Sequence, residues 1–190
     1  MLADRDQHTR SLIQQAQRGD ARAFEELYNQ YSALVLRTAY LLLGEYVHTE
    51  DVTQEVFVEV YRHLDQYQSE RGAFATWIYR ITVNKCTRVQ QRWRFWQRGS
   101  SLNDHGDYPS PILSPLEVAL IGDQQRRVWL AVQQLSLKLR TVVILRYYHN
   151  LPYAEIAQIV QCPIGTVRSR LNAAHTHLQR NLEEYVDAKS

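Results

Sequence analysis

The sequence predicts an all-α fold made of two helical domains that are joined by a flexible linker, the second containing a helix-turn-helix. Apolar side chains recur with helical spacing in both halves of the chain, and no alternating pattern is long enough to predict a strand. A stretch rich in glycine, serine and proline interrupts this spacing. We therefore expect a first domain over 10–96, a linker over 97–117 and a second domain over 118–182.

The first domain contains three predicted amphipathic helices. The first carries an apolar stripe with a period of 3.6 residues: Phe24, Leu27, Tyr28, Tyr31, Leu34, Val35, Thr38 and Leu42. It ends at Gly44, since glycine favours the left-handed conformation at a helix C-terminus. The second runs from Val52 to Leu64 with Thr49 as its N-cap, and the third begins after Gly72.

The linker is long enough to separate the domains widely. Its ~21 residues span up to ~70 Å when extended, which is about two turns of B-DNA. Helical spacing resumes near Leu116 and continues through Val128, Val132 and Leu135. The two domains could therefore bind sites that lie far apart.

Composition excludes several classes of protein. The 190 residues include 22 basic and 20 acidic side chains, so the chain is not a polycation. Cys86 and Cys162 stand far apart, which argues against a disulfide framework or a zinc site and favours a reducing, cytoplasmic location. We expect neither a signal peptide nor a membrane span, and no glycine-rich phosphate loop occurs.

Charge is unevenly distributed along the chain. Residues 45–70 contain seven acidic side chains and one basic, whereas residues 84–98 contain five basic and no acidic side chains. Residues 120–182 contain eight basic side chains and only two acidic ones, Asp123 and Glu155. One acidic and two basic regions predict more than one binding partner.

The strongest local motif is a helix-turn-helix over 151–178. A short helix over 153–160 is followed by a turn at Cys162 and Pro163, and a second helix buries Val167, Leu171, Ala174 and Leu178. Its other face presents Arg168, Ser169, Asn172 and His175, to which we add Thr166 at the start of the helix. A basic helix face without acids fits the DNA major groove, where Arg reads guanine and Asn reads adenine. Arg170 flanks the buried stripe, so it either contacts a DNA phosphate or packs against the protein. For the motif as a whole, the alternative to DNA binding is an ordinary helical hairpin whose basic face is solvated.

The chain resembles the extracytoplasmic-function sigma factors, the small two-domain specificity subunits of bacterial RNA polymerase. The resemblance covers residues 16–182 apart from the linker. It is carried by these segments: Phe24–Tyr28 with Tyr31, Glu50–Phe57, Phe74–Ile81 with Asn84, Leu145–Tyr147, Tyr153–Ala157 and Gly165–Leu171. It implies a non-enzymatic transcription initiation factor without a cofactor, whose partners are core RNA polymerase and promoter DNA as duplex and as melted strand. Members are often held by an anti-sigma factor, so such a partner is also open for this chain.

The resemblance implies two sites in the first domain. The helix that carries Asp51, Gln54, Glu55 and Val58 would bind the clamp helices of the polymerase, since these side chains fall off the apolar stripe and would face outward. A solvated acidic face is the alternative. The melted promoter strand would lie on the following helix, with stacking surfaces and polar contacts from Phe74, Trp77, Tyr79, Arg80, Asn84, Lys85, Arg88 and Arg92. Many members have Asp where this chain has Arg88, so the melted sequence is not fixed by the resemblance.

Other chemistry is disfavoured. His175 and His177 are two residues apart on a helix and point to different sides, so we expect no metal site. The acids of 50–59 are expected to face outward without a pocket, which disfavours catalysis. The segment 93–96 alternates aromatic and basic residues and could either stack on single-stranded DNA or seat the linker.

Two rival functions remain at this stage. A dimeric helix-turn-helix regulator would need a self-complementary interface and would read a palindrome, whereas a sigma factor reads two dissimilar elements. A pure adaptor would co-purify with polymerase but would give no promoter-dependent transcript. Footprinting and transcription assays distinguish the three hypotheses.

Overall fold

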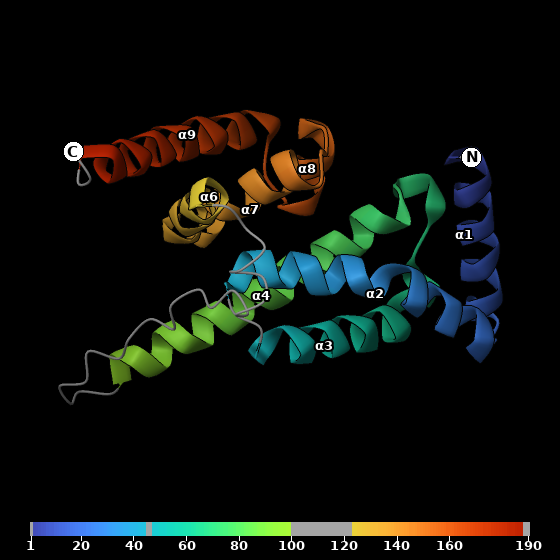
Figure 1. The fold of residues 1–190 in the computed structure, drawn as a ribbon. Helices are drawn as coiled ribbons and strands as arrows, with labels where there is room; N and C mark the ends of the chain where they lie inside the picture. The colour runs from blue at the N-terminus through green and yellow to red at the C-terminus, as the bar shows by residue number, and fades with distance from the viewer. Residues whose placement is uncertain (1, 45–46, 100–122, 188–190) are drawn as a thin grey trace.

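The computed structural model describes residues 2–44, 47–99 and 123–187, and every regular element in these ranges is helical (Figure 1). The all-α, two-domain prediction is confirmed. The first domain contains the four helices α1 (Leu2–Gln17), α2 (Ala21–Leu43), α3 (Val47–His63) and α4 (Phe74–Gly99), with short 3-10 turns η1 (Leu64–Gln66) and η2 (Ser69–Arg71) before α4. The second contains α6 (Asp123–Gln134), α7 (Leu137–Val143), the π-helical turn η3 (Ile144–Tyr148), α8 (Tyr153–Ile159) and α9 (Ile164–Asp187).

The ends of α2 are fixed by local chemistry. The Asp20 carboxylate accepts hydrogen bonds from the backbone N–H groups of Arg22 and Ala23, which otherwise have no partner in the first turn. Gly44 ends the helix with φ +81°, and its N–H donates to the Tyr40 carbonyl, as the sequence predicts. The predicted N-cap of α3 is wrong, because α3 already begins at Val47 and Thr49 lies buried inside its first turns.

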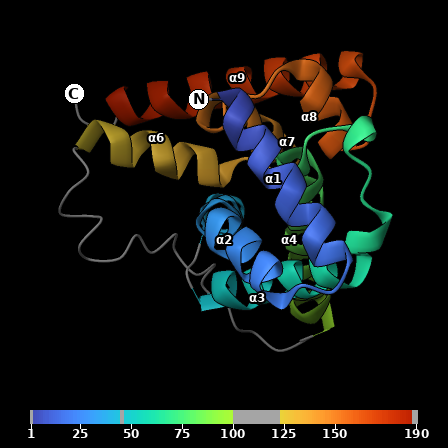
Figure 2. The same ribbon diagram turned by 90° about the vertical axis from the view of Figure 1, so that its right-hand side faces the viewer.

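Helices α2, α3 and α4 pack around one core. Their innermost side chains are fully buried and come from the predicted stripes: Leu27, Val35, Leu42, Val52, Val56, Val60 and Ile78. The sequence did not predict α1, which crosses α2 and buries Leu12 and Ile13 against the same core (Figure 2). Tight packing of this kind holds the outward faces of α3 and α4 in a fixed orientation.

Helix α4 is longer than the predicted domain. It continues through Gly99, three residues into the range 97–117 that the sequence assigns to the linker. The rest of that range, and the predicted restart near Leu116, lie outside the described residues. The structure resumes with α6 at Asp123.

The helix-turn-helix consists of α8 and α9. Ile156 and Ile159 of α8 and the predicted set Val167, Leu171 and Ala174 of α9 are buried together, and Leu178 packs at the edge of this core. The turn between the helices bends at Gln161, which has a positive φ of 50°.

The two domains are in contact. In both views α6–α9 lie on the side of α2 and α4 that is opposite α3 (Figures 1 and 2). Helix α8 packs against α4, and α7 and η3 pack against α2. The core is therefore continuous between the domains.

Candidate functional site

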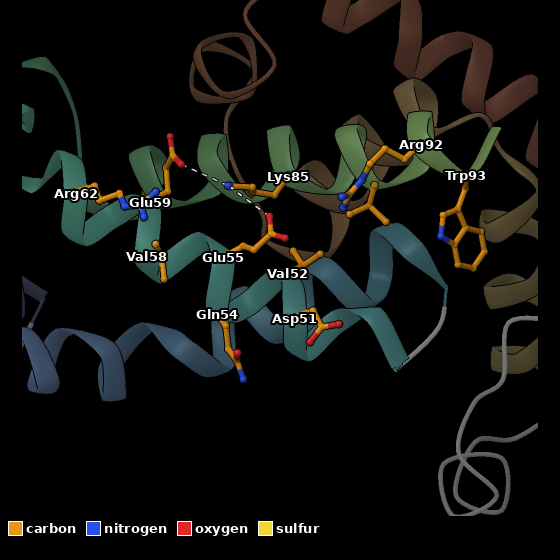
Figure 3. A pocket seen from close by; sticks show the side chains of 11 residues that line it. Asp51, Val52, Gln54, Glu55, Val58, Glu59, Arg62, Lys85, Arg92 and Trp93 are labelled. Atoms are coloured by element: carbon orange, nitrogen blue, oxygen red, sulfur yellow. Dashed lines mark ion pairs between the residues drawn. The ribbon is translucent and has the colours of Figure 1, made fainter. Parts of the chain in front are cut away.

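A groove of about 810 Å³ lies between α3 and α4 (Figure 3). Asp51, Gln54, Glu55 and Val58 lie along its α3 side and are all exposed, as their spacing predicts. The aliphatic side chain among them, Val58, exposes 48% of its surface. An exposed aliphatic side chain between carboxylates is a surface that suits an apolar and basic partner.

The groove also contains basic and aromatic side chains, which the sequence analysis did not expect beside these acids. Lys85 of α4 forms ion pairs with Glu55 and Glu59 of α3, each with 3.4 Å between nitrogen and oxygen (Figure 3). Its side chain is only 15% exposed. The expected role of Lys85 in contacting DNA phosphate is therefore not supported in this arrangement, because its charge is already directed to α3.

The far end of the groove includes part of the aromatic segment 93–96. Trp93 is half-buried in the groove wall, whereas Phe95 exposes 77% of its surface. The side chains of Arg94 and Trp96 lie outside the described residues. Trp93 thus forms part of the groove lining.

Aromatic rings cluster where α4 begins. Phe74 is 4% exposed and lies at the centre of the cluster, with ring centroids 5.1–5.6 Å from those of Tyr31, Tyr67 and Trp77. The expectation that Phe74 offers a free stacking face is wrong for this structure, since the rings around it fill both sides. Tyr79 is likewise buried, at 5%, because His149 of the second domain packs on it.

Trp77 and Tyr67 instead line a second cavity of about 400 Å³. Its wall is completed by Gln66, Gln68, Gly72, Ala73, Thr76 and Arg80 of the first domain and Gln158 of the second. The Tyr67 hydroxyl donates to the Gly72 carbonyl over 2.9 Å. Sequence analysis missed Tyr67. The nearby Gly72, which has a φ of 147° that favours glycine, was the available signal of an unusual loop conformation at this place.

Polar and basic side chains continue along α4 beyond this cavity. Arg80 is half-buried, and Asn84, Arg88 and Arg92 are exposed at successive intervals of four residues. Such spacing keeps neighbours on one side of a helix. These four positions therefore form a polar strip, as the sequence predicts.

The exposed face of α9 also has the expected composition. Arg168, Ser169, Asn172 and His175 are exposed, whereas Thr166 and Arg170 are half-buried. The half-buried position of Arg170 leaves both of its expected roles open. His175 is held by a 2.7 Å hydrogen bond between its Nε2 and the Tyr147 hydroxyl, a partner that sequence spacing could not reveal.

Redox and metal chemistry find little support in the described part of the chain. Burial raises the pKa of the Cys86 thiol to about 12, so this cysteine is an inert core residue. The Cys162 thiol lies 3.6 Å from the Pro163 carbonyl at the turn before α9. Among the described residues, no three His, Cys, Asp or Glu side chains gather closely enough to bind a metal ion.

In the same residues, no helix has both the length and the apolar character to cross a membrane.

Comparison with known proteins identifies both helical units. Residues 27–95 match the family model described as Sigma-70 region 2, and residues 125–178 match Sigma-70, region 4. The chain is 33% identical to RNA polymerase sigma-H factor of Pseudomonas aeruginosa, over 90% of this chain and 92% of the relative. It is 30% identical to ECF RNA polymerase sigma-E factor of Escherichia coli K12, over 92% and 94% of the two chains.

The fold also resembles that of solved structures. The structure of CnrH in complex with the cytosolic domain of CnrY has a TM-score of 0.65 and 26% identity, and the match covers 96% of this chain and 99% of that one. The Bartonella quintana sigma factor RpoE, solved with the anti-sigma factor NepR, has a TM-score of 0.64 at 22% identity, over 86% and 98%. The second of these likenesses concerns the fold alone.

Proposed function

Because the chain belongs to the extracytoplasmic-function sigma factors, which direct RNA polymerase to promoters without catalysing a reaction themselves, we propose how its two domains divide that work. The first domain, residues 10–96, binds core polymerase and the melted promoter strand. The second domain, residues 118–182, binds the upstream promoter element as duplex DNA. The residues between them, 97–117, form the connection that lets both bind one promoter.

The groove between α3 and α4 is the proposed polymerase site. Asp51, Gln54, Glu55 and Val58 present two carboxylates, an amide and an aliphatic side chain on one exposed face. Lys85 orients Glu55 by pairing with it, so the carboxylate is held at the groove edge. A partner helix with basic and apolar side chains fits this surface, because its charges would meet carboxylates that remain half exposed.

The start of α4 is the proposed site for the melted strand. The cavity of about 400 Å³ has room for a nucleobase, with Trp77 and Tyr67 as ring surfaces and Arg80 beside them. Phe74 supports these rings from the core, and the strip of Asn84, Arg88 and Arg92 can follow the backbone. Stacking returns ~1–3 kcal/mol per base and opening a base step costs ~1.4 kcal/mol. A few captured bases can therefore start melting, but the polymerase must stabilise the rest.

The exposed face of α9 is the proposed reader of the upstream duplex. Arg168, Ser169, Asn172 and His175 project from a helix that is anchored by a buried stripe, the arrangement that lets a helix enter the major groove. We assign Thr166 and Arg170 at its flanks to contacts with the DNA backbone, with packing as the alternative role of the half-buried Arg170. The observation that carries the whole assignment is the coexistence of an outward face of α3 with two exposed carboxylates on one domain and a basic exposed helix face on the other.

Run-off transcription tests the proposal. Purified core polymerase is incubated with a promoter library, with and without this chain, and start sites are sequenced. We expect new start sites that share two dissimilar elements, and we expect Arg80→Ala and Arg168→Ala to weaken selection at different elements. A chain that leaves the start sites unchanged would refute the function.

We extend the proposal to location and regulation. Action on polymerase places the chain in the cytoplasm. The likeness to CnrH, which was solved with the cytosolic domain of CnrY, and to RpoE, which was solved with the anti-sigma factor NepR, supports an anti-sigma factor for this chain as well. Pull-down from cells with the tagged chain tests it, since the expected partner competes with core polymerase.

A further inference from the structure

Helix α1 lies outside the part of the chain that matches the Sigma-70 region 2 model, which begins at residue 27. None of the binding sites proposed above includes a residue of this helix. It nevertheless stands at the end of the first domain where the chain passes from α3 to α4, and it packs against η1 (Figures 1 and 2). The loop 64–72, which contains η1 and η2, forms part of the wall of the cavity proposed for the melted strand.

Tyr67 and Gln68 of this loop separate α1 from the cavity. On one side they line the cavity of about 400 Å³ together with Trp77. On the other side they line a smaller space of about 190 Å³, whose opposite wall is α1. A stretch of backbone between two open spaces has few packing partners, so its position depends on the contacts that α1 supplies.

The contact that joins α1 to the start of the loop comes from Gln17, the last residue of the helix. Its Nε2 donates to the Leu64 carbonyl over 2.8 Å and to the Tyr67 carbonyl over 3.2 Å. A side-chain amide has two N–H donors and a carbonyl oxygen has two lone pairs. One glutamine can therefore bind both carbonyls, while the Leu64 carbonyl still accepts from the Tyr67 N–H.

The position of Gln17 is itself fixed by the corner between α1 and α2. Gly19 has a φ of 92°, which favours glycine, and its N–H donates to the Ala16 carbonyl over 3.0 Å. Asp20 follows directly as the N-cap of α2. Ile13, one turn before Gln17, is buried in the core. The amide thus extends from a well-packed part of the domain.

A second contact reaches the far end of the loop. The Ser69 hydroxyl donates to the Glu70 carboxylate over 3.1 Å. Hydrogen bonds from the Glu70 backbone N–H and from Ser69 lower the pKa of this carboxyl, and the nearby charge of Arg10 on α1 lowers it further. The Tyr67 hydroxyl closes the loop by donating to the Gly72 carbonyl. Helix α1 therefore lies along the loop from its start to its second turn.

We propose that Gln17 is a positioning residue for capture of the melted strand, because its amide holds the loop 64–72, and with it the Tyr67 ring, at the wall of the cavity. This inference rests on the proposed function for its statement of what the cavity binds. Gln17 acts through Tyr67 and does not itself contact the base. A loop that is held in advance spares the strand the cost of ordering it.

Loss of this amide should affect capture more than folding. Gln17 is exposed, so water can replace its hydrogen bonds, and the buried side chains of α1 remain in place. When only a fraction of the molecules keeps the loop in the binding position, the apparent dissociation constant rises by the inverse of that fraction. If about one molecule in five does so, capture weakens about fivefold. The ring would also no longer shape the cavity around one base.

The test uses the holoenzyme, formed from core polymerase and the full chain. Gln17→Met keeps the length of the side chain but removes both donors. Gln15→Met is the matched control, since Gln15 is exposed on the same helix and its amide donates to Ser11 instead. Run-off transcription from a promoter library, with all four bases at each position of the melted element, measures base preference. Hydrogen exchange of the free chain measures opening of the loop 64–72, and thermal unfolding measures stability.

We expect Gln17→Met to speed exchange in the loop 64–72 but not in α2–α4, and to lower base preference about fivefold at one position of the melted element. Selection at the upstream duplex element should not change. A merely structural role would instead lower thermal stability and reduce transcription evenly on all promoters. Gln17→Lys supplies N–H donors again and should restore the preference. Gln15→Lys added to Gln17→Met brings the same charge and should not restore it.

Unchanged exchange in the loop, or faster exchange with unchanged base preference, would overturn the inference. Tyr67→Ala separates it from the proposed function, because this variant removes the ring itself. If Tyr67→Ala lowers the preference and Gln17→Met does not, the cavity captures the strand and only the role of Gln17 is refuted. If neither variant lowers it, the cavity is not the capture site and both assignments fall. A holoenzyme that selects no promoter with the unmodified chain would refute the function itself.

Discussion

His149 is held between two domains by both of its ring nitrogens. The groups that face it are Thr38 and Arg37 of α2, Tyr79 of α4 and the neighbouring Tyr148. Burial, together with the positive charge of Arg37, lowers the pKa of His149 from 6.5 to about 4. Protonation of His149 at Nδ1 would turn this nitrogen into a donor that faces the donating Tyr79 hydroxyl. It would also bring the positively charged ring close to the Arg37 cation.

The sign of the resulting pH dependence follows. Packing between the two domains lowers the pKa of His149, so the neutral ring stabilises this packing fully above pH 6.5. The stabilisation is lost as the pH falls from 6.5 toward 4. We expect an NMR titration of the His149 ring to give a pKa near 4 in the free chain. In the Thr38→Val variant the pKa should move toward 6.5. A titration near 6.5 in the unmodified chain would contradict the closed packing at this residue.

Arg168 is exposed on α9, and the proposed function assigns it to reading a base edge. Replacing it with alanine should cost ~1–3 kcal/mol on the preferred duplex and relax selection at one position. Arg180, exposed further along the same helix, provides the control: Arg180→Ala should weaken all duplexes by a similar, smaller amount. Fluorescence anisotropy on a set of single-base duplex variants measures both. An equal loss on every duplex for Arg168→Ala would mean that it contacts only phosphate.

At the scale of the helix, sequence spacing predicted which side of an element faces outward. The exposed sets on α3 and α9 follow from helical period alone, because a buried stripe fixes the opposite face. Phe74 and Tyr79 could not be placed in this way. What covers them is a loop residue, Tyr67, and a histidine 70 residues away, and such long-range partners leave no trace in local spacing.

Helix α3 can be tested as a docking element. Replacing Asp51 and Glu55 together by lysine should abolish co-purification with core polymerase, because both carboxylates of the exposed face would become cations. Stability should change little, since Glu55 is half exposed, ion pairs of exposed groups contribute about 0–1 kcal/mol, and Lys85 keeps Glu59 as its second partner. Thermal unfolding by circular dichroism measures this.

The matched control lies on the same helix. Glu50→Lys reverses an exposed charge that lies outside the groove, so it should leave polymerase binding intact. If Glu50→Lys weakened binding as much as the double variant, the effect would be one of net charge and the docking face would be misplaced.

At the scale of the whole molecule, the two domains have conflicting demands. The contact between the domains pairs Arg140 with the Leu42 carbonyl and His149 with the Thr38 hydroxyl, whereas the proposed capture of the melted strand would need the face of α4 against which α8 packs. A partner resolves the conflict only if it binds the open state more tightly than the closed one. Core polymerase can reach the groove between α3 and α4 in this arrangement, because the residues that line the groove all belong to the first domain. It would separate the domains if it also bound the second domain in a position away from α4.

Polymerase binding should therefore open the chain. Spin labels are attached to cysteines introduced at Glu26 of α2 and Gln179 of α9, both exposed, with Cys162 replaced by serine. Pulsed dipolar spectroscopy on the free chain should give one narrow distance distribution. Addition of core polymerase should shift it to longer distances, and the Asp51/Glu55 double lysine variant should prevent the shift. An unchanged distribution in the polymerase complex would show that the domains bind their partner while still closed, and the strand would then have to reach α4 by another route.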